Sequence, residues 1–331
     1  MCRGTALYTH NRLEAYQEAM TSLSVIIPAY NSADFLGATL TAILGQSTPP
    51  SEVIVVDDGS TDETQDIAAS FGSPVRCYRV ENGGQGKARA FAIGHTTCEW
   101  VALCDSDDIW NENHLERRWM LIDCYPDADF SYSDFRSFGP NADPNHTLLQ
   151  EAPAEWLEQW VNIDEHNFYP LKQPYPAILR FNPAYPSGMV FRRSTYLKMG
   201  GFREKYSRWI AEDSEFTRRF SSLADVTFIG DSQQTWNYRR HPSNYSLIQW
   251  RNFEAKATIL QEHLDLGVVP VEFLQLTQNE LERSRSLAFD QAFWGKAYDD
   301  ANRMYHLLPR HSRSIKRRLR YMIARLKSKA A

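Results

Sequence analysis

The stretch from Glu99 to Trp110 reads EWVALCDSDDIW, and the interpretation of the whole chain starts from it. Its apolar run, Val101 to Cys104, is typical of a buried strand. The run ends in three carboxylates within four residues, Asp105, Asp107 and Asp108. Like charges this close repel one another, and burying them unpaired is costly, whereas a divalent cation removes both problems.

Oxygen ligands of this kind suit Mg²⁺ or Mn²⁺, with the phosphates of a substrate completing the coordination shell. The carboxyl end of a strand is also where open α/β sheets place their ligands. We therefore interpret the three aspartates as a metal–diphosphate site. The alternative is an acidic turn that caps the next helix, since Asp is a good N-cap.

A strand–helix rhythm surrounds this stretch and predicts an α/β fold with a mostly parallel central sheet and right-handed crossovers. The expected strands are 23–28, 52–57, 75–80 and 99–105, followed by 128–135, 187–191, 225–229 and 234–239. Between 136 and 186 the rhythm fails, and the only helix expected there is 154–161. Helical periodicity dominates after residue 245, with a helical hairpin around Trp294 and Gly295.

Composition narrows the class of protein. The chain has 331 residues and a net charge of −5, which argues against a general nucleic-acid binder. Five cysteines without a CxxC pair fit a reducing compartment better than a disulfide framework. No apolar run of 18 residues and no signal peptide are found, so we predict a cytoplasmic protein.

Three parts of the chain are expected. Residues 1–20 form an irregular N-terminal segment, and Met20 is an alternative start. Residues 21–246 form the main domain, with 136–186 as an insertion. Residues 247–331 form a helical extension that ends in a basic amphipathic helix.

The tail carries nine Lys/Arg and no Asp/Glu between Arg310 and Lys329. An apolar stripe at helical spacing runs along it: Ile315, Leu319, Met322, Ile323 and Leu326. This pattern is typical of a helix that lies on the anionic inner face of a membrane. A solvated helix that packs its stripe on the protein is the alternative.

Four other positions carry candidate chemistry, each with a structural alternative. Asp58, after the second strand, suits a ribose hydroxyl or a base N–H, or caps the next helix. Gly84, in a glycine cluster at a helix start, offers bare amides to a phosphate, with Lys87 nearby, or is a flexible turn. Asp213 suits a general base or an acid stabilised by the helix dipole. His241, between arginines and a proline, suits a diphosphate or metal contact, or is structural.

Together these motifs resemble the inverting glycosyltransferases of family 2, which have the GT-A fold. The resemblance spans about 23–246 and rests on SVIIPAYN, VIVVDDGSTDET, NGGQGKARA, CDSDDIW, SGMVFRRSTYLKMGGF, AEDSEFTRRF and YRRHPSNYS, in the family's order. It implies a three-layer GT-A sandwich with a mostly parallel central sheet.

The resemblance also implies roles for individual residues. Pro28, Tyr30 and Asp58 would hold the base and ribose of a nucleotide, with Asp105 near the ribose. Asp107 would bind the divalent metal that bridges the donor's phosphates. Asp213 would be the general base. The ligand of His241 stays open, and a metal contact is our assignment.

The implied activity is metal-dependent transfer of a sugar, with inversion, from a UDP-, dTDP- or GDP-sugar to a hydroxyl of a glycan or lipid-linked acceptor, in the assembly of surface polysaccharide. A nucleotidyltransferase that makes sugar nucleotides and a non-catalytic sugar-nucleotide binder are the alternatives. We expect acceptor recognition in the 136–186 insertion, whose aromatic residues either stack on sugars or pack a lid. They are Trp156, Trp160, Phe168, Tyr169, Tyr175 and Tyr185.

Overall fold

A computed structural model describes residues 23–140, 142–143, 145–158, 163–171, 173–241 and 249–328. The predicted N-terminal segment 1–20, the start at Met20 and the predicted boundary at 246 lie outside these residues. The described residues form two compact units. The first contains the chain up to Arg208 together with Leu223–His241, and the second contains Trp209–Ser222 and the chain after His241. Each unit is described by itself.

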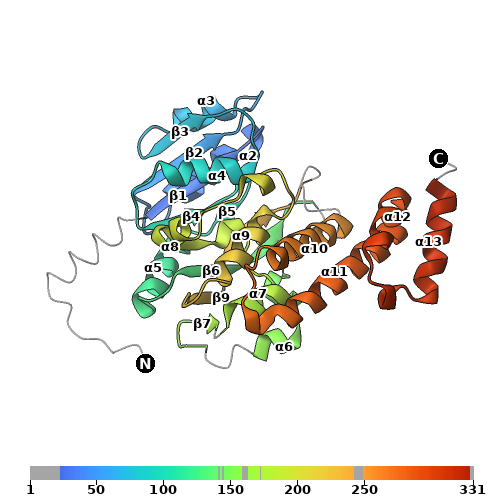
Figure 1. Cartoon of the computed structure of the whole chain (residues 1–331). Coiled ribbons are helices and arrows are strands. Elements are labelled where there is room, and N and C mark those ends of the chain that lie inside the picture. Colours follow the sequence, from blue (N-terminus) through green and yellow to red (C-terminus); the bar gives the residue numbers. More distant parts are fainter. Residues whose placement is uncertain are drawn as a thin grey trace. The chain divides into compact units, whose positions relative to one another are not determined.

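The first unit is built on one mixed sheet, whose described strands run in the order β3–β2–β1–β4–β8–β6–β9–β5, with β7 added on β9 (Figure 1). The pairs β1–β2, β2–β3, β1–β4 and β6–β9 are parallel, whereas β8, β5 and β7 pair antiparallel. The strands are β1 (Leu23–Ala29), β2 (Glu52–Asp57), β3 (Val75–Arg79), β4 (Trp100–Leu103), β5 (Ile109–Trp110), β6 (Phe130–Phe138), β7 (Phe168–Leu171), β8 (Val190–Arg192) and β9 (Phe228–Arg239). The predicted parallel part of the sheet is therefore formed by β1, β2, β3 and β4.

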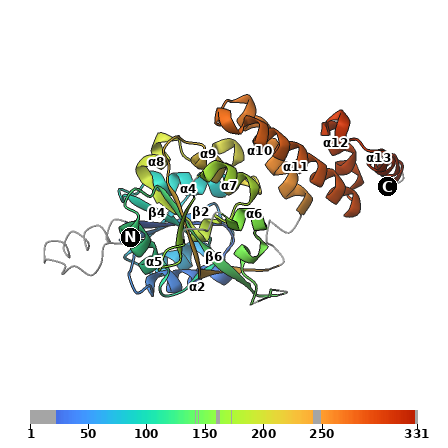
Figure 2. The same ribbon diagram turned by 90° about the horizontal axis from the view of Figure 1, so that it is seen from below.

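Helices cover both faces of this sheet, which is why β1 is buried at all of its positions. Val25 and Ile27 pack with Leu40 of α2 in one hydrophobic cluster. α4 packs against β1 and β2 from the opposite side (Figure 2). The helices of this unit are α2 (Ala33–Leu44), α3 (Thr64–Ser70), α4 (Gln85–Gly94), α5 (His114–Cys124), α6 (Ala154–Leu157), α7 (Pro174–Arg180) and α8 (Arg193–Lys198).

The 136–186 insertion has more regular structure than predicted. Besides the expected short helix, seen as α6, it contains β7 and α7. β7 includes Pro170, which argues against a central strand, but β7 pairs only with β9, and an edge strand tolerates proline. α7 begins with Pro174, whose fixed backbone angle suits the first turn of a helix.

The prediction of two strands at 225–229 and 234–239 is wrong, because β9 is one strand from Phe228 to Arg239. Its pairing with β6 shifts register around Asp134, so extra residues of β9 bulge out near 232–235. The carboxylate of Asp231 accepts a hydrogen bond from the Gln233 amide at 2.9 Å inside this bulge. A polar bulge between two apolar halves gives the sequence the appearance of a turn.

The second unit is helical. It contains α9 (Glu212–Ser221), α10 (Gln249–Asp265), α11 (Leu274–Trp294), α12 (Tyr298–Leu307) and α13 (Ile315–Ser328). α10 packs along α11, and α11 turns at Gly295 into α12, which confirms the predicted helical hairpin. α13 packs on α12 and α11. Within the described part of the chain, no helix is long and apolar enough to cross a bilayer.

Candidate active site

The loops that follow β1 and β2 are bonded to each other at the carboxyl edge of the sheet. The Asp58 amide donates to the Ala29 carbonyl at 2.8 Å, and the Thr61 amide donates to the side chain of Asn31 at 2.8 Å. Pro28 is buried within β1, whereas Tyr30 is 50% exposed directly after the strand. Of these two predicted nucleotide contacts, Tyr30 is the one that offers an accessible surface.

Asp58 anchors the glycine loop. Its carboxylate accepts hydrogen bonds from the amides of Gly83 at 2.7 Å and Gly84 at 2.8 Å. In this structure Asp58 therefore occupies the two amides that the sequence offers to a phosphate. Gly84 has a φ of +91°, and a Cβ there would lie 2.3 Å from the Ser207 carbonyl oxygen, so only glycine fits.

Two basic residues of α4 behave differently. Lys87 is about half exposed and lies 3.6 Å from the carboxylate of Glu204, which is itself exposed. A pair of this kind is weak, so the Lys87 ammonium can turn toward an anionic ligand. Arg89, in contrast, is fully buried and donates to Asp105 at 2.6 Å. Arg89 is therefore the counter-ion of the acidic loop.

The three aspartates of the DSDD loop have three different environments. Asp105 is bound by Arg89, and its own amide donates to the Ser187 hydroxyl at 2.9 Å. Asp107 is partly exposed and lies 2.8 Å from Nε2 of His241. The sequence motif presents the three aspartates as one acidic group, but in the fold their carboxylates bind different partners.

Asp108 is an internal member of this loop. Its side chain is buried and accepts hydrogen bonds from the Ser187 hydroxyl at 2.6 Å and the Arg239 amide at 2.9 Å. Its carbonyl oxygen accepts from the hydroxyl of Thr39 at 2.9 Å. Ser187 thus ties Asp105 to Asp108, which holds the loop in shape.

Burial raises the pKa of Asp107, and the neighbouring charge of Asp105 raises it further. Burial also raises the pKa of Asp108 well above its ordinary value, with the charge of Asp107 as the second cause. Both shifts mean that the folded loop disfavours its full negative charge. A bound cation relieves such repulsion.

Asp107 and His241 are the residues that could hold a cation. The His241 ring stacks on Phe35 with the ring centroids 4.9 Å apart, which orients Nε2 toward Asp107. Across the described residues, no group of three or more His, Cys, Asp or Glu side chains is arranged around one point. The Asp107 carboxylate nevertheless fits a Mg²⁺-type site, because such ions bind one or two carboxylates together with substrate phosphates and water, and His241 adds a nitrogen ligand beside it.

The predicted base, Asp213, lies in the first turn of α9, which belongs to the second unit. It is partly exposed, whereas its neighbour Glu212 is buried. The Thr217 hydroxyl donates to the Asp213 carbonyl oxygen at 2.8 Å. Of Glu212, Asp213 and Glu215, the three acids in this motif, only Asp213 has a partly exposed side chain.

Four aromatic side chains of the insertion do not form a sugar-stacking surface within the first unit. Trp156, Phe168, Tyr169 and Tyr175 are 0–2% exposed, so the prediction that they stack on sugars is wrong. Trp156 lies edge-on to Tyr169 with the ring centroids 6.3 Å apart. Trp160 lies outside the described residues. These side chains pack inward, and Phe168 clusters with Leu121, Ala128 and Ile229 from outside the insertion.

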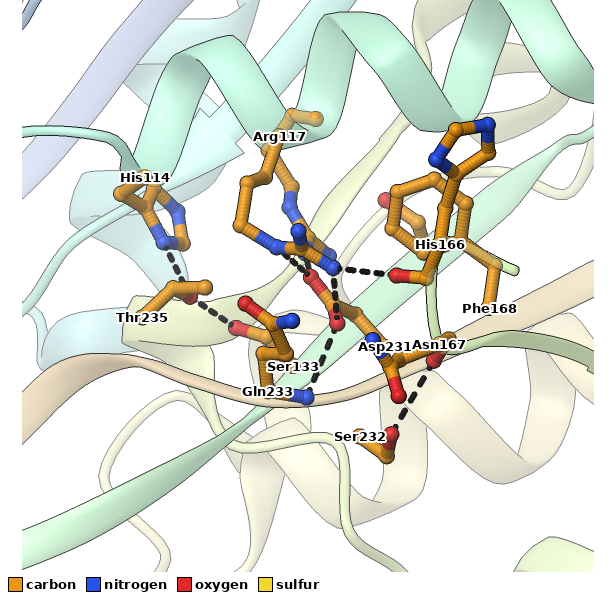
Figure 3. Close-up of polar contacts among 12 residues, drawn as sticks. His114, Arg117, Ser133, His166, Asn167, Phe168, Asp231, Ser232, Gln233 and Thr235 are labelled. Atoms are coloured by element: carbon orange, nitrogen blue, oxygen red, sulfur yellow. Dashed lines mark hydrogen bonds and ion pairs between the residues drawn. The ribbon is translucent and has the colours of Figure 1, made fainter. Parts of the chain in front are cut away.

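A second acidic centre is formed by Asp231 on β9, a residue outside every motif that the sequence singled out (Figure 3). Asp231 is fully buried and accepts two hydrogen bonds from Arg117, both at 2.8 Å, and a third from Arg118. The Arg117 guanidinium also donates to the His166 carbonyl at 2.8 Å. No local sequence pattern marks this cluster, because its members lie on α5, β9 and a loop.

In the same region, His114 lies 2.7 Å from the Thr235 hydroxyl, which donates to Ser133 at 2.7 Å (Figure 3). Burial lowers the pKa of His114 well below its ordinary value, and the charge of Arg118 lowers it further. His114 is therefore neutral in the folded protein at physiological pH. Complete burial makes this network a structural one.

The arrangement of sheet and loops is that of the GT-A fold. The structure aligns with that of TarS from S. aureus bound to UDP-GlcNAc, with a TM-score of 0.62 and 17% identity over 92% of this chain and 89% of that one. It also aligns with the mannosyltransferase PcManGT from Pyrobaculum calidifontis bound to GDP-Man and Mn²⁺, with a TM-score of 0.59 and 18% identity over 95% and 93% of the two chains.

The family follows from the sequence itself. The profile of glycosyl transferase family 2 matches residues 24–200, more than half of the chain, and the protein belongs to this family. TuaG of Bacillus subtilis, named as a teichuronic acid biosynthesis glycosyltransferase, is 39% identical over 100 residues, which are 29% of this chain and 40% of TuaG. The matches to the curated relatives span 15–40% of those proteins' own length.

Proposed function

We propose that the protein is a metal-dependent, inverting glycosyltransferase that moves a sugar from a nucleotide-diphosphate donor to an acceptor hydroxyl. The observation that carries this proposal is the pair of Asp107 and His241 beside Asp105. Their loop carries more negative charge than its one buried arginine neutralises. A family 2 chain with such a loop at the carboxyl edge of its sheet is suited to a metal-bound diphosphate.

Each predicted donor contact has a physical basis in this proposal. Tyr30 offers an exposed ring to a nucleotide base. Asp58 has a second lone pair on each oxygen, beyond those that accept the glycine amides, and can accept from a ribose hydroxyl or a base N–H. Gly84 acts by allowing that anchoring of Asp58. Lys87 adds a mobile positive charge for the diphosphate.

The metal ligands act on the leaving group. Asp107 and His241 would hold Mg²⁺ or Mn²⁺, which when bound supplies a positive charge to the departing nucleoside diphosphate. Asp105 is held by Arg89 at its carboxylate and by Ser187 at its backbone amide, and it would lie beside the ribose of the donor. The structure of the mannosyltransferase PcManGT contains GDP-Man and Mn²⁺, which supports a nucleotide-sugar donor and a divalent cation as the molecules that this site would bind.

Asp213 is proposed as the general base. Its carboxylate would take the proton from the acceptor hydroxyl while that oxygen attacks the anomeric carbon from the face opposite the leaving diphosphate. The bond from the anomeric carbon to the diphosphate oxygen breaks in the same displacement, so configuration inverts. The acceptor would be a glycan or a lipid-linked acceptor used in surface polysaccharide assembly. The name of TuaG, which refers to teichuronic acid biosynthesis, supports a role in polymer synthesis.

Release of nucleoside diphosphate from a panel of UDP-, dTDP- and GDP-sugars tests the proposal, with Mn²⁺, with Mg²⁺ and with a chelator. We expect one donor to be turned over only when the metal is present. Consumption of a nucleoside triphosphate and a sugar phosphate would instead indicate the nucleotidyltransferase. Donor binding without any release, in the presence of candidate acceptors, would indicate the non-catalytic binder.

Asp213→Asn tests the base. We expect turnover to fall by roughly a hundredfold or more, the scale of general-base catalysis, with donor affinity unchanged. Asp66→Asn is the matched control, because Asp66 is also an acid in the first turn of a helix but lies exposed on α3. Normal turnover by Asp213→Asn would show that another group takes the proton.

A further inference from the structure

The last helix, α13, presents its apolar residues to solvent. Their exposed fractions are 86% for Ile315, 54% for Leu319, 53% for Met322, 38% for Ile323 and 71% for Leu326. The alternative in which this stripe packs on the protein is therefore wrong for the described residues. An exposed continuous apolar face of this kind marks an interaction surface.

The opposite face of α13 holds the helix onto its own unit. Ala324 is fully buried, and Tyr321 stacks on Tyr305 of α12 with the ring centroids 4.2 Å apart. Arg317 and Arg320 both pair with Asp290 of α11, at 2.8 Å and 2.6 Å. α13 lies beside α12 (Figure 1), and these contacts fix its rotation about its axis, so the outward direction of the apolar stripe follows from packing.

Exposed cations flank the apolar stripe on both sides. With 3.6 residues per turn, Lys316 and Lys327 fall along one border of the stripe, and Arg318 and Arg325 fall along the other. All four are exposed. Long basic side chains at the borders of an apolar face can extend past it to charged headgroups while the stripe enters the acyl region.

We propose that this outward face of α13 is a docking surface for an anionic lipid bilayer, with the helix lying in the plane of the headgroups. The proposal goes beyond the sugar-transfer activity and does not depend on it. Charge complementarity favours lipid as the occupant. α13 carries six Lys/Arg and no Asp/Glu, so a second copy of the same face would bring like charges together.

Flotation of the full chain with lipid vesicles tests this surface. We expect binding to vesicles of phosphatidylcholine mixed with phosphatidylglycerol, weaker binding at high salt, and little binding to phosphatidylcholine alone. The double variant Leu319→Glu, Leu326→Glu should lower binding roughly tenfold or more, because it places charge in the apolar stripe. Neutralising Lys316, Arg318, Arg325 and Lys327 together to Gln should abolish the preference for phosphatidylglycerol.

The matched control is the double variant Leu266→Glu, Val271→Glu. It places two charges on apolar side chains of the same unit that lie outside α13 and are 59% and 80% exposed. We expect this variant to float like the wild type, and circular dichroism should show that all variants fold. Equal flotation of wild type and the Leu319, Leu326 variant would overturn the proposal. A second result would also overturn the proposal: the wild type does not bind vesicles, forms a dimer by light scattering, and the Leu319, Leu326 variant is a monomer. That result would assign the face to a second copy of the chain.

Discussion

The DSDD loop and Asp231 are two carboxylate centres of the same unit that are neutralised in different ways. Asp231 is a single buried carboxylate held by two arginines and one backbone amide. The DSDD loop gathers three carboxylates, and the partners found for them are one arginine, one histidine and neutral donors. The Asp231 carboxylate is fully buried and accepts four hydrogen bonds, whereas the DSDD loop is negative and partly open.

This difference distinguishes structural carboxylates from ligand-binding carboxylates better than the number of acidic residues does. A fully paired buried charge cannot accept a ligand without breaking its bonds, and removing one partner is strongly destabilising. A cluster whose pKa values are raised by burial and by like charge is a candidate binding site, because a positive ligand improves it. Asp108 shows that both types occur within four residues, since it belongs to the internal framework of its loop.

The largest expected effect concerns the open centre. Asp107→Asn should lower turnover roughly a hundredfold or more, because it removes a proposed metal ligand. Its melting temperature should be equal to or above that of the wild type, because the raised pKa means that the ionised carboxylate opposes folding at neutral pH. A coupled assay of diphosphate release and calorimetry measure both quantities. Loss of activity together with a large loss of stability would place Asp107 with the structural carboxylates.

The saturated centre should give the reverse result. Asp231→Asn should lower the free energy of unfolding by about 3–5 kcal/mol, because Arg117 and Arg118 would stay buried without their counter-charge. Urea denaturation followed by circular dichroism measures this loss. Asp123→Asn, at an exposed position of α5, is the control and should change stability by less than about 0.5 kcal/mol. Full stability in the Asp231 variant would remove the contrast.

A third carboxylate, in the second unit, extends the comparison to pH. Glu215 is buried and bound by Arg219 at 2.7 Å and His263 at 3.3 Å, and these partners lower its pKa to about 2 against the opposing effect of burial. A depressed pKa stabilises the fold above the unfolded pKa of about 4.5, and this stability is lost as the pH falls toward 2.

The shift corresponds to about 3 kcal/mol, an order-of-magnitude figure. Glu215→Gln should therefore lose stability at pH 7 and show a flatter dependence than the wild type between pH 4.5 and pH 2. Acid titration of the unfolding free energy of both proteins measures the difference. If the unfolding free energies of the two proteins changed with pH in parallel, Glu215 would not be the cause of the acid dependence.

Much of the fold and part of the site could be predicted from local sequence. The apolar runs of β1, β2 and β4 predict a buried parallel sheet, since helices on both faces leave few positions of the strands open to solvent. The acids directly after β4 follow from the same pattern. The local sequence did not predict β7, a short edge strand with a proline, and it predicted two strands in place of β9, whose polar bulge looks like a turn.

Contacts between distant segments could not be predicted in this way. Asp58 meets Gly84, Arg89 meets Asp105, and Asp107 meets His241 across 134 residues of sequence. Each pair depends on which loops the sheet order brings to one edge. Burial of Trp156 and its neighbours is equally a matter of which segment covers them, since an aromatic side chain suits a core and a sugar surface alike.

The sequence by itself determined the family, the parallel half of the sheet, the acidic loop and the amphipathic pattern of the last helix, because each is written in the order and spacing of neighbouring residues. The tertiary structure alone decided which carboxylates are paired and which stay open, and which side of α13 faces outward. Those outcomes depend on long-range packing and on the removal of charges from water, and neither is a property of a short stretch of chain.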